Sequence, residues 1–254
     1  MKDWDININY GIKTGFNDAF IITTEKRDEI LANCRSDDER QRTAELIRPI
    51  LRGRDIKRYG YEWADLWLIN THNGIKGKTP PIDINDYPAV KQHLDRYWDK
   101  ISKRDDKGVT PYNLRNCGYL DDFSKLKIMY PNMTKFLPFY YDKKGFFQND
   151  KSFMITGKRL AFLAAFLNSS LFKFCFIDNF AELQGGTREL RKIFFDKIPV
   201  YQPDNEIEKR FVQLVNDIQK EYSIYKAKRI DEEIFAIYGL TEEEQRQIGY
   251  IEIT

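Results

Sequence analysis

The sequence predicts a mixed α+β fold, and three features of the chain support this prediction. Short apolar runs at residues 126–130 and 152–156 are typical of strands. Apolar residues at helical spacing predict an amphipathic helix from residue 207 onward. Glycines and prolines separate such segments, and 254 residues are enough for one large domain or two small ones.

The composition is that of a globular protein with an uneven charge distribution. Aromatic residues make up 15% and charged residues 31% of the chain, so many planar faces are available to pack or to stack. The net charge is only +2, but residues 204–254 hold 12 acids and 7 bases, and the positive excess lies in residues 1–203. A surface for nucleic acid is therefore expected in residues 1–203.

Membrane insertion, secretion and a disulfide framework are not expected. No stretch reaches the length of a membrane span, and the N-terminal residues lack the apolar core of a signal peptide. Cys34, Cys117 and Cys175 are odd in number and far apart, which fits a reducing cytoplasm. With only two histidines and no cysteine pair at ligand spacing, a zinc site is not expected either.

Residues 9–24 begin with a glycine-containing loop and predict a strand at residues 19–22. Lys13, Thr14 and Asn17 lie on this loop, where such side chains can contact phosphates. The spacing differs from that of a P-loop, in which Gly-Lys-Ser/Thr opens a helix, so nucleotide binding is not expected. An ordinary tight turn is the competing interpretation.

The most basic segment of the chain is LIRPILRGRDIKRY, residues 46–59. Its apolar residues interleave with the basic ones and are expected to be buried, so the basic groups would form a rigid edge facing a polyanion. Forked guanidinium groups suit a phosphate or the edge of a guanine. The residues expected to make such contacts are Arg52, Arg54, Lys57 and Arg58. The alternative is an amphipathic turn whose arginines pair with surface acids.

On either side of this segment the pattern predicts a helix at residues 37–46, a strand at 61–70 and a loop at 72–81. Two glycines and two prolines break the last of these, and two lysines make it basic. A further helix is expected over residues 87–101, with Asp86 as its N-cap and a proline in its first turn.

Two polar loops carry the remaining candidate contacts. Residues 103–117 combine an aromatic ring with Asn113 and Arg115, a mixture that can stack on and hydrogen-bond to bases. Such mixtures are also common in ordinary loops. Gln184 and Arg188 lie at the ends of a second, glycine-containing loop.

The second half of the chain predicts further regular elements. Residues 142–145 suit a hairpin turn, residues 158–177 a buried helix and residues 197–199 a strand. In the tail, a long amphipathic helix is expected over residues 207–225 with a capping box at its start, followed by a short helix that stops at Gly239 and by one more helix. The expected capping boxes are formed by Asn205 with Glu208 and by Thr241 with Glu244.

No catalytic signature is complete in this sequence. The only Pro-Pro, in Thr79-Pro80-Pro81-Ile82, lacks both ends of the Asn/Asp/Ser-Pro-Pro-aromatic turn that holds a flipped base in amino-methyltransferases. Asp55-Ile56-Lys57 could belong to a metal-dependent nuclease, but a carboxylate among several cations is more simply an ion-pair partner. No catalytic residue and no metal ligand are therefore assigned.

Several segments together resemble a known family. They are YGIKTGFNDAF at residues 10–20, IRPILRGRDIKRY at 47–59, TPYNLR at 110–115, FLNS at 166–169 and the tail signature within residues 230–244. These segments resemble the TaqI-like C-terminal specificity domain of bacterial adenine-N6 DNA methyltransferases and of fused restriction-modification enzymes. The resemblance covers nearly the whole chain, and LRGRDIKRY is its most specific part.

The resemblance implies a mixed α/β target recognition domain at residues 1–203, with a helical tail at 204–254 packed on it. It implies that this chain chooses the DNA sequence, while a methyltransferase domain missing from it binds S-adenosylmethionine and performs the chemistry. The expected partners are double-stranded DNA and that methyltransferase domain or subunit, in the bacterial cytoplasm.

Three functional hypotheses follow from these patterns. The first is a sequence-recognition module of a restriction-modification enzyme, with no activity of its own. The second is a self-sufficient metal-dependent nuclease that uses Asp55 and Lys57. The third is a protein-interaction domain that binds a methyltransferase subunit through the acidic helical tail.

Overall fold

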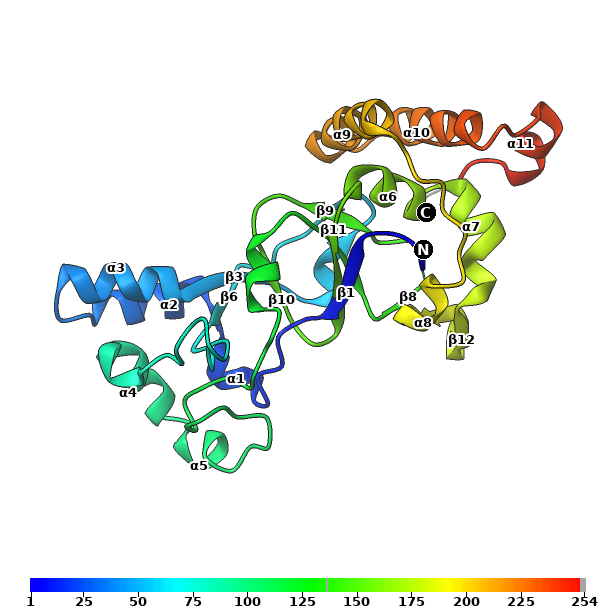
Figure 1. The fold of residues 1–254 in the computed structure, drawn as a ribbon. Coiled ribbons are helices and arrows are strands. Elements are labelled where there is room, and N and C mark those ends of the chain that lie inside the picture. Colours follow the sequence, from blue (N-terminus) through cyan, green and yellow to red (C-terminus); the bar gives the residue numbers. More distant parts are fainter. Residues whose placement is uncertain (136, 252–254) are drawn as a thin grey trace.

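The computed structural model describes residues 1–135 and 137–251. These residues fold into two lobes, each with a small β-sheet and its own hydrophobic core (Figure 1). Helices accompany both sheets, so the fold is mixed α+β, as predicted.

The first lobe is centred on a four-stranded sheet in the order β10-β3-β6-β2. Its strands are β2 (Ile21–Thr23), β3 (Ile47–Leu51), β6 (Leu66–Ile69) and β10 (Phe147–Gln148). Strand β3 pairs in parallel with β10 and antiparallel with β6, which in turn pairs antiparallel with β2. Ile47 and Ile50 of β3 are buried in the hydrophobic core of this lobe.

Five short helices form the outer end of this lobe, at the left in Figure 1. They are α1 (Asn17–Phe20), α2 (Thr24–Ala32), α3 (Asp37–Leu46), α4 (Pro88–Asp95) and α5 (Trp98–Ile101). Helix α3 confirms the predicted helix at residues 37–46, and the Ser36 hydroxyl caps it by accepting a hydrogen bond from the Glu39 amide at 3.2 Å. The buried Glu39 carboxylate also accepts a hydrogen bond from the Ala89 amide at 3.0 Å, which fastens α3 to α4.

Two predictions for this lobe are only partly correct. The strand expected at residues 19–22 is α1 followed by β2, because Ala19 and Phe20 are buried on a helical turn. The helix expected over residues 87–101 is divided into α4 and α5. The division falls at Tyr97, whose backbone leaves the helical conformation and whose ring packs against Phe16.

The second lobe is centred on an antiparallel sheet in the order β1-β11-β7-β9. Its strands are β1 (Ile6–Tyr10), β7 (Lys127–Pro131), β9 (Tyr140–Asp142) and β11 (Ser152–Gly157). The two strands predicted at residues 126–130 and 152–156 are confirmed. They are neighbours in this sheet, with Phe153 opposite Tyr130.

A fully buried ion pair joins β7 to β9. Lys127 Nζ lies 2.5 Å from an Asp142 carboxylate oxygen, and burial lowers the pKa of Lys127 while Asp142 opposes that shift. The Asp142 carboxylate also accepts hydrogen bonds from the amides of Lys144 and Phe146, so it shapes the following turn. The turn predicted at residues 142–145 exists, but it is not a hairpin, because it leads from β9 to β10 in the other sheet.

The buried helix predicted at residues 158–177 is divided in two by a bend of 65°. The two helices are α6 (Leu160–Leu167), which is wholly buried, and α7 (Ser170–Phe176). Asn168 ends α6 by donating hydrogen bonds from its amide to two backbone carbonyls, at 2.7 and 2.9 Å. Across the part of the chain that the structure describes, no single helix has the length and hydrophobicity of a membrane span, although this bent pair taken together reaches both.

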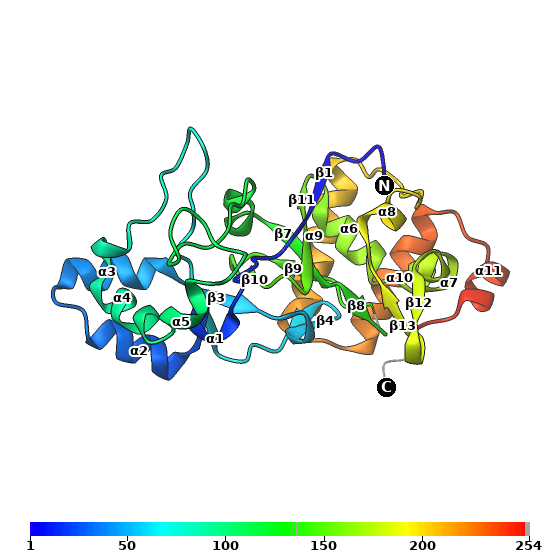
Figure 2. The same cartoon turned by 90° about the horizontal axis from the view of Figure 1, so that it is seen from below.

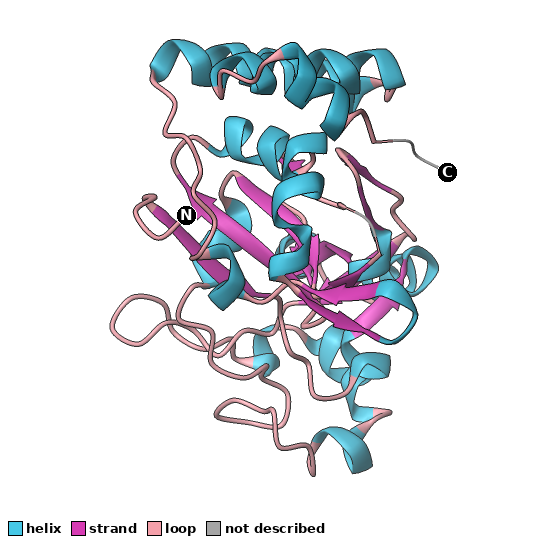
Figure 3. Ribbon diagram, turned by 90° about the vertical axis from the view of Figure 1, so that its right-hand side faces the viewer, coloured by secondary structure: helices cyan, strands magenta, loops and turns pink. Residues whose placement is uncertain are grey.

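The tail folds back over α6 as a layer of helices (Figure 3). Its helices are α9 (Asn205–Lys220), α10 (Ile224–Ile237) and α11 (Glu242–Ile248). Phe211 and Val215 of α9 belong to the same hydrophobic core as α6. The tail therefore buries its apolar face against the second lobe.

Two carboxylates of the tail, the half-buried Glu208 and the buried Asp231, cap the helices beneath it. Glu208 accepts hydrogen bonds at 3.0 and 3.1 Å from two amides in the first turn of α6. Asp231 accepts hydrogen bonds from the amide and hydroxyl of Ser170 at the start of α7, at 2.9 and 2.6 Å. Burial raises the pKa of both carboxyl groups.

The capping predictions for the tail therefore have mixed outcomes. The box expected from Asn205 and Glu208 is wrong, because Asp204 is the N-cap of α9 and Glu208 caps a different helix. The box expected from Thr241 and Glu244 is confirmed at the start of α11. The long helix expected over residues 207–225 ends earlier, as α9 at Lys220, since Ser223 starts α10 as a new N-cap. The helix expected to stop at Gly239 is α10, which ends at Ile237.

The remaining elements are short. The strands and helix are β4 (Ile56–Lys57), β5 (Gly60–Tyr61), β8 (Met133–Thr134), β12 (Ala181–Leu183), β13 (Thr187–Glu189) and α8 (Lys192–Phe195). The 3-10 turns are η1 (Gly53–Asp55), η2 (Ile84–Asp86), η3 (Leu120–Ser124), η4 (Ile177–Asn179) and η5 (Gln184–Gly186). The strand predicted at residues 61–70 is divided between β5 and β6 by a turn at Asp65, and residues 197–199 form no strand.

Candidate nucleic-acid interface

Two arginines of the basic segment at residues 46–59 are engaged inside the protein. Arg52 donates hydrogen bonds from Nε and Nη2 to both carboxylate oxygens of Asp55, at 2.9 and 2.8 Å, and this contact raises the pKa of Arg52. Arg58 donates to the carbonyl oxygen of Asn168 at 2.8 and 3.1 Å and to the Tyr222 hydroxyl at 3.1 Å. These side chains fasten the segment to itself and to the end of α6.

The other two predicted contacts of this segment are exposed. Arg54 has no hydrogen-bond or charged partner among the described residues, and Lys57 lies 3.1 Å from Glu62. The segment connects the two lobes, and Tyr59 is fully buried in the core of the second. The expected continuous basic edge is therefore not what the structure shows, because Arg52 and Arg58 are engaged in hydrogen bonds within the protein.

A second basic surface is formed by three loops that are far apart in the sequence. We call residues 11–17, 71–82 and 103–118 the loop cluster; Figure 2 shows its middle loop extending outward from the first lobe. The three loops hold seven lysines and arginines but two aspartates. The predicted contact residues that meet here are Lys13, Thr14, Asn17, Asn113 and Arg115.

The buried guanidinium group of Arg104 organises the loop at residues 103–118 and joins it to the loop at residues 11–17. It donates hydrogen bonds to four carbonyl oxygens, those of Thr14, Asp106 (2.8 Å), Pro111 (3.0 Å) and Asn113 (2.5 Å). It also lies over the ring of Phe20, 4.4 Å from its centroid. Burial lowers the pKa of Arg104 to about 10, so the group remains charged at neutral pH. Sequence reasoning did not single out Arg104.

Two of the predicted contacts support the loops from within. The Asn113 side chain is buried; its amide donates to the Ile82 carbonyl at 2.8 Å, and its oxygen accepts from the Thr110 hydroxyl at 2.6 Å. The Thr14 hydroxyl is also buried and donates to the Asn17 side chain at 2.6 Å. Asn113 and Thr14 thus set the shape of the cluster.

Two cations on the exposed face of the cluster share one aspartate. Lys13 and Arg115 both bind Asp106, at 2.9 and 3.3 Å. Exposed ion pairs of this kind contribute little to stability, so these cations can exchange the carboxylate for another anion. The side chains of Lys76 and Lys103 are exposed and have no charged or hydrogen-bonding partner within the described part of the chain.

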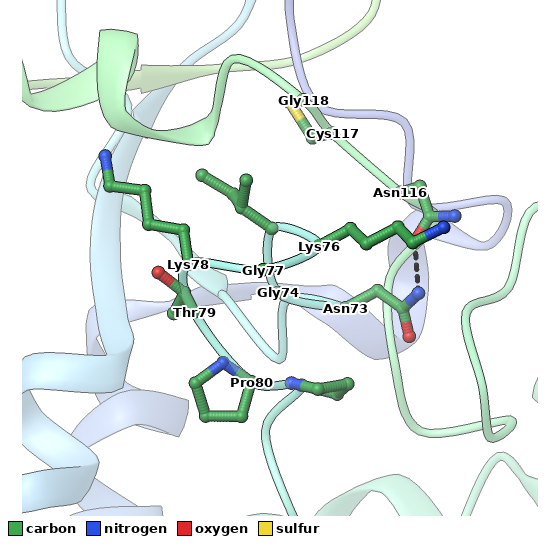
Figure 4. A pocket seen from close by; sticks show the side chains of 12 residues that line it. Asn73, Gly74, Lys76, Gly77, Lys78, Thr79, Pro80, Asn116, Cys117 and Gly118 are labelled. Atoms are coloured by element: carbon green, nitrogen blue, oxygen red, sulfur yellow. Dashed lines mark hydrogen bonds between the residues drawn. The ribbon is translucent and has the colours of Figure 1, made fainter.

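The middle loop borders a pocket of about 690 Å³ (Figure 4). The pocket is lined by residues 73–81 from one side and by Asn116, Cys117 and Gly118 from the other. Its polar side chains include the amides of Asn73 and Asn116, the hydroxyl of Thr79 and two lysines. The cluster therefore combines cations with hydrogen-bonding groups at one open site.

The last two predicted contacts lie elsewhere, on the β12–β13 hairpin of the second lobe. Arg188 binds Asp178 at 2.8 Å and Glu182 at 3.1 Å, and it donates to the Phe180 carbonyl. Gln184 is exposed at the tip of the hairpin. The structure thus places the predicted contacts in three separate regions.

The nuclease hypothesis depends on Asp55 as a metal ligand. Both carboxylate oxygens of Asp55 are already bound by Arg52. Over residues 1–135 and 137–251, no three His, Cys, Asp or Glu side chains are grouped closely enough to hold a metal ion. The described residues therefore offer this hypothesis no ready metal site.

Comparison with known proteins gives one family match and two informative structural neighbours. The family model of the TaqI-like C-terminal specificity domain matches residues 48–200. The type IIL restriction-modification enzyme MmeI, solved in complex with DNA, is similar with a TM-score of 0.66 and 13% identity. The type IIG restriction endonuclease BpuSI is similar with a TM-score of 0.55 and 13% identity. No curated protein sequence matches this chain.

The two structural matches differ greatly in how much of each protein they cover. They take in 95% of this chain but 35% of MmeI, and 93% of this chain but 31% of BpuSI. The chain thus spans about a third of the length of each enzyme, with the same fold as that part.

Proposed function

The chain belongs to the family of TaqI-like C-terminal specificity domains, and on that premise we propose that it recognises a short sequence in double-stranded DNA. It would do so on behalf of a restriction-modification enzyme, with the loop cluster as the surface that faces the duplex. The single observation that carries this choice of surface is the convergence of three remote loops, in which Arg104 binds residues 103–118 to residues 11–17 and Asn113 binds them to residues 71–82.

The charge of the loop cluster suits a duplex. Lysines and arginines that neutralise phosphates release counterions, and this supplies affinity that is independent of sequence. Discrimination among sequences needs donors and acceptors held in fixed positions at the base edges. The buried hydrogen bonds of Asn113 and Arg104 supply such fixed positions, because they leave the loops little freedom to rearrange.

We propose that the chemistry is performed by a different domain or subunit. A methyltransferase that binds S-adenosylmethionine would methylate adenine at N6, with or without cleavage by the same enzyme, in the bacterial cytoplasm. Flipping the target base costs a few kcal/mol, and clamping the duplex between two domains offsets part of this. The greater length of MmeI and BpuSI is consistent with such a division of labour.

The test is the affinity of the 254-residue chain for duplex DNA as a function of salt. Four phosphate contacts predict roughly a 600-fold loss of affinity between about 50 and 300 mM salt. Fluorescence anisotropy with a labelled duplex measures this directly. An affinity that does not change with salt would contradict the proposal, and capture of a methyltransferase without any affinity for DNA would favour an interaction domain instead.

A further inference from the structure

The middle loop of the cluster is a short, well-defined hairpin at residues 73–81. Ile75 and Thr79 pair antiparallel, with the Ile75 amide donating to the Thr79 carbonyl at 2.8 Å. The Ile75 carbonyl accepts from the amides of Lys78 and Thr79, both at 2.9 Å, which closes a tight turn. Gly77 occupies the left-handed region of that turn, with φ of 76°.

At the base of the hairpin, the backbone leaves no room for a side chain at Gly74. Gly74 has φ of 70°, and a Cβ there would lie 2.2 Å from the Thr79 carbonyl oxygen. Asn73 is bound on both sides, because its amide donates to the Asn116 side chain and its oxygen accepts from the Val109 amide at 2.7 Å. The hairpin therefore projects from the loop cluster in a fixed direction.

The two lysines beside Gly77 point in opposite directions (Figure 4). Lys78 forms an ion pair with Asp121, and both side chains are exposed, at 63% and 47%. Lys76 extends toward the side on which Asn73 and Asn116 lie. Within the described residues it has no charged or hydrogen-bonding partner.

We propose that this hairpin enters the major groove of the recognised DNA, where Lys76 reads a guanine and Lys78 binds a phosphate. This inference rests on the proposed function. An ammonium group has donors but no acceptor, and guanine presents two neighbouring acceptors, N7 and O6, at its major-groove edge. The major groove, about 12 Å wide, admits a two-stranded ribbon.

The shape of the tip supports the same assignment. A Cβ at Gly77 would meet nothing within 4 Å, so the tip is bare and can approach the floor of a groove closely. Lys78, on the other side, would exchange the exposed Asp121 carboxylate for a backbone phosphate. Lys76 is thus assigned to reading the base sequence, and Lys78 to fixing the position of the protein along the duplex.

The experiment selects binding sites from a pool of random duplexes with the 254-residue chain and with three variants. Lys76→Met and Lys78→Met each remove one ammonium group from the hairpin. Lys173→Met, at an exposed position on α7, removes one from the second lobe and is the matched control. Because all three side chains are exposed, the melting temperature of each variant should equal that of the wild type, and this is measured first.

The two hairpin variants should change DNA binding in different ways. For Lys76→Met we expect the selected sequence to lose its preference at one guanine, with affinity for the wild-type site reduced roughly 10- to 100-fold. For Lys78→Met we expect the same selected sequence, uniformly weaker binding and a salt dependence reduced by about one phosphate contact. Lys173→Met should behave as the wild type does.

The outcomes separate this inference from the proposed function. If the wild type selects a sequence and Lys76→Met selects the same one with equal affinity, the hairpin assignment is wrong but sequence recognition stands. If the wild type selects nothing and its binding does not depend on salt, the proposed function fails and this inference fails with it.

Discussion

Replacing Arg104 by methionine should loosen the loop cluster and lower the stability of the whole protein. The guanidinium group makes four hydrogen bonds to carbonyls, and at about 1.5 kcal/mol for each they set an upper limit of about 6 kcal/mol. The variant also removes the desolvation cost of a buried cation, which offsets about half of that. A net loss of about 3 kcal/mol corresponds to a fall in melting temperature of about 6–12 °C for a chain of this size.

The assay combines calorimetry with amide hydrogen exchange at two positions in the cluster. The Gly108 amide donates to the Asn113 carbonyl within the same loop at 3.0 Å, and the Leu114 amide donates to the Thr71 carbonyl of the middle loop at 2.8 Å; both amides should lose protection in Arg104→Met. Arg115→Met is the control, since this exposed arginine makes a single ion pair and should change stability by less than about 0.5 kcal/mol. If Arg104→Met has the melting temperature of the wild type and both amides stay protected from exchange, Arg104 does not hold these loops.

Three further predictions concern other parts of the fold. Lys127→Met leaves a buried Asp142 carboxylate without its cation and should lower stability by about 3–5 kcal/mol in chemical denaturation, whereas the double variant that also carries Asp142→Asn should recover part of this. The folded pKa of Asp231 is raised above its unfolded value, so the native state binds protons more readily. Lowering the pH from about 7 to about 4 should therefore stabilise the wild type relative to Asp231→Asn, and an equal response in both proteins would refute this. Gly74→Ala should abolish DNA binding by distorting the hairpin, whereas Gly60→Ala, where the nearest atom is 4.0 Å from the added Cβ, should bind normally; equal binding by both would show that hairpin shape is unimportant.

Features that depend on near neighbours in the chain could be predicted from the sequence. The helix at residues 37–46 and the capping box of Thr241 with Glu244 both arise from hydrogen bonds within a single turn. The strands at residues 126–130 and 152–156 follow from short apolar runs, and they were expected as strands without knowledge of their pairing.

Features that depend on distant partners could not be predicted in this way. The direction of the Arg58 side chain is decided by the Asn168 carbonyl, which lies 110 residues away in the sequence. Glu208 sits where a capping box would place it, but it caps α6 because the tail folds back over that helix. Because such distant partners decide where side chains point, a run of basic residues in the sequence does not by itself make a basic surface.

In the loop cluster, too, some features could be predicted from the sequence and others depend on the folded structure. Lys13, Asn17 and Arg115 were expected as contacts from their separate loops, and the structure brings them together. The lysines at 76 and 78 were visible only as charges on a loop broken by glycine and proline. Their opposite directions required the hairpin itself.

The proposed DNA-binding surface can be tested most directly by lysine acetylation of the 254-residue chain, with and without saturating duplex DNA, followed by mass spectrometry. We expect DNA to protect the loop-cluster lysines while Lys57 and Lys173, which lie on other surfaces, react as in the free protein. The lysines expected to be protected are Lys13, Lys76, Lys78 and Lys103. Protection of Lys57 with unchanged reactivity in the loop cluster would contradict the account and would return the contact surface to the basic segment at residues 46–59.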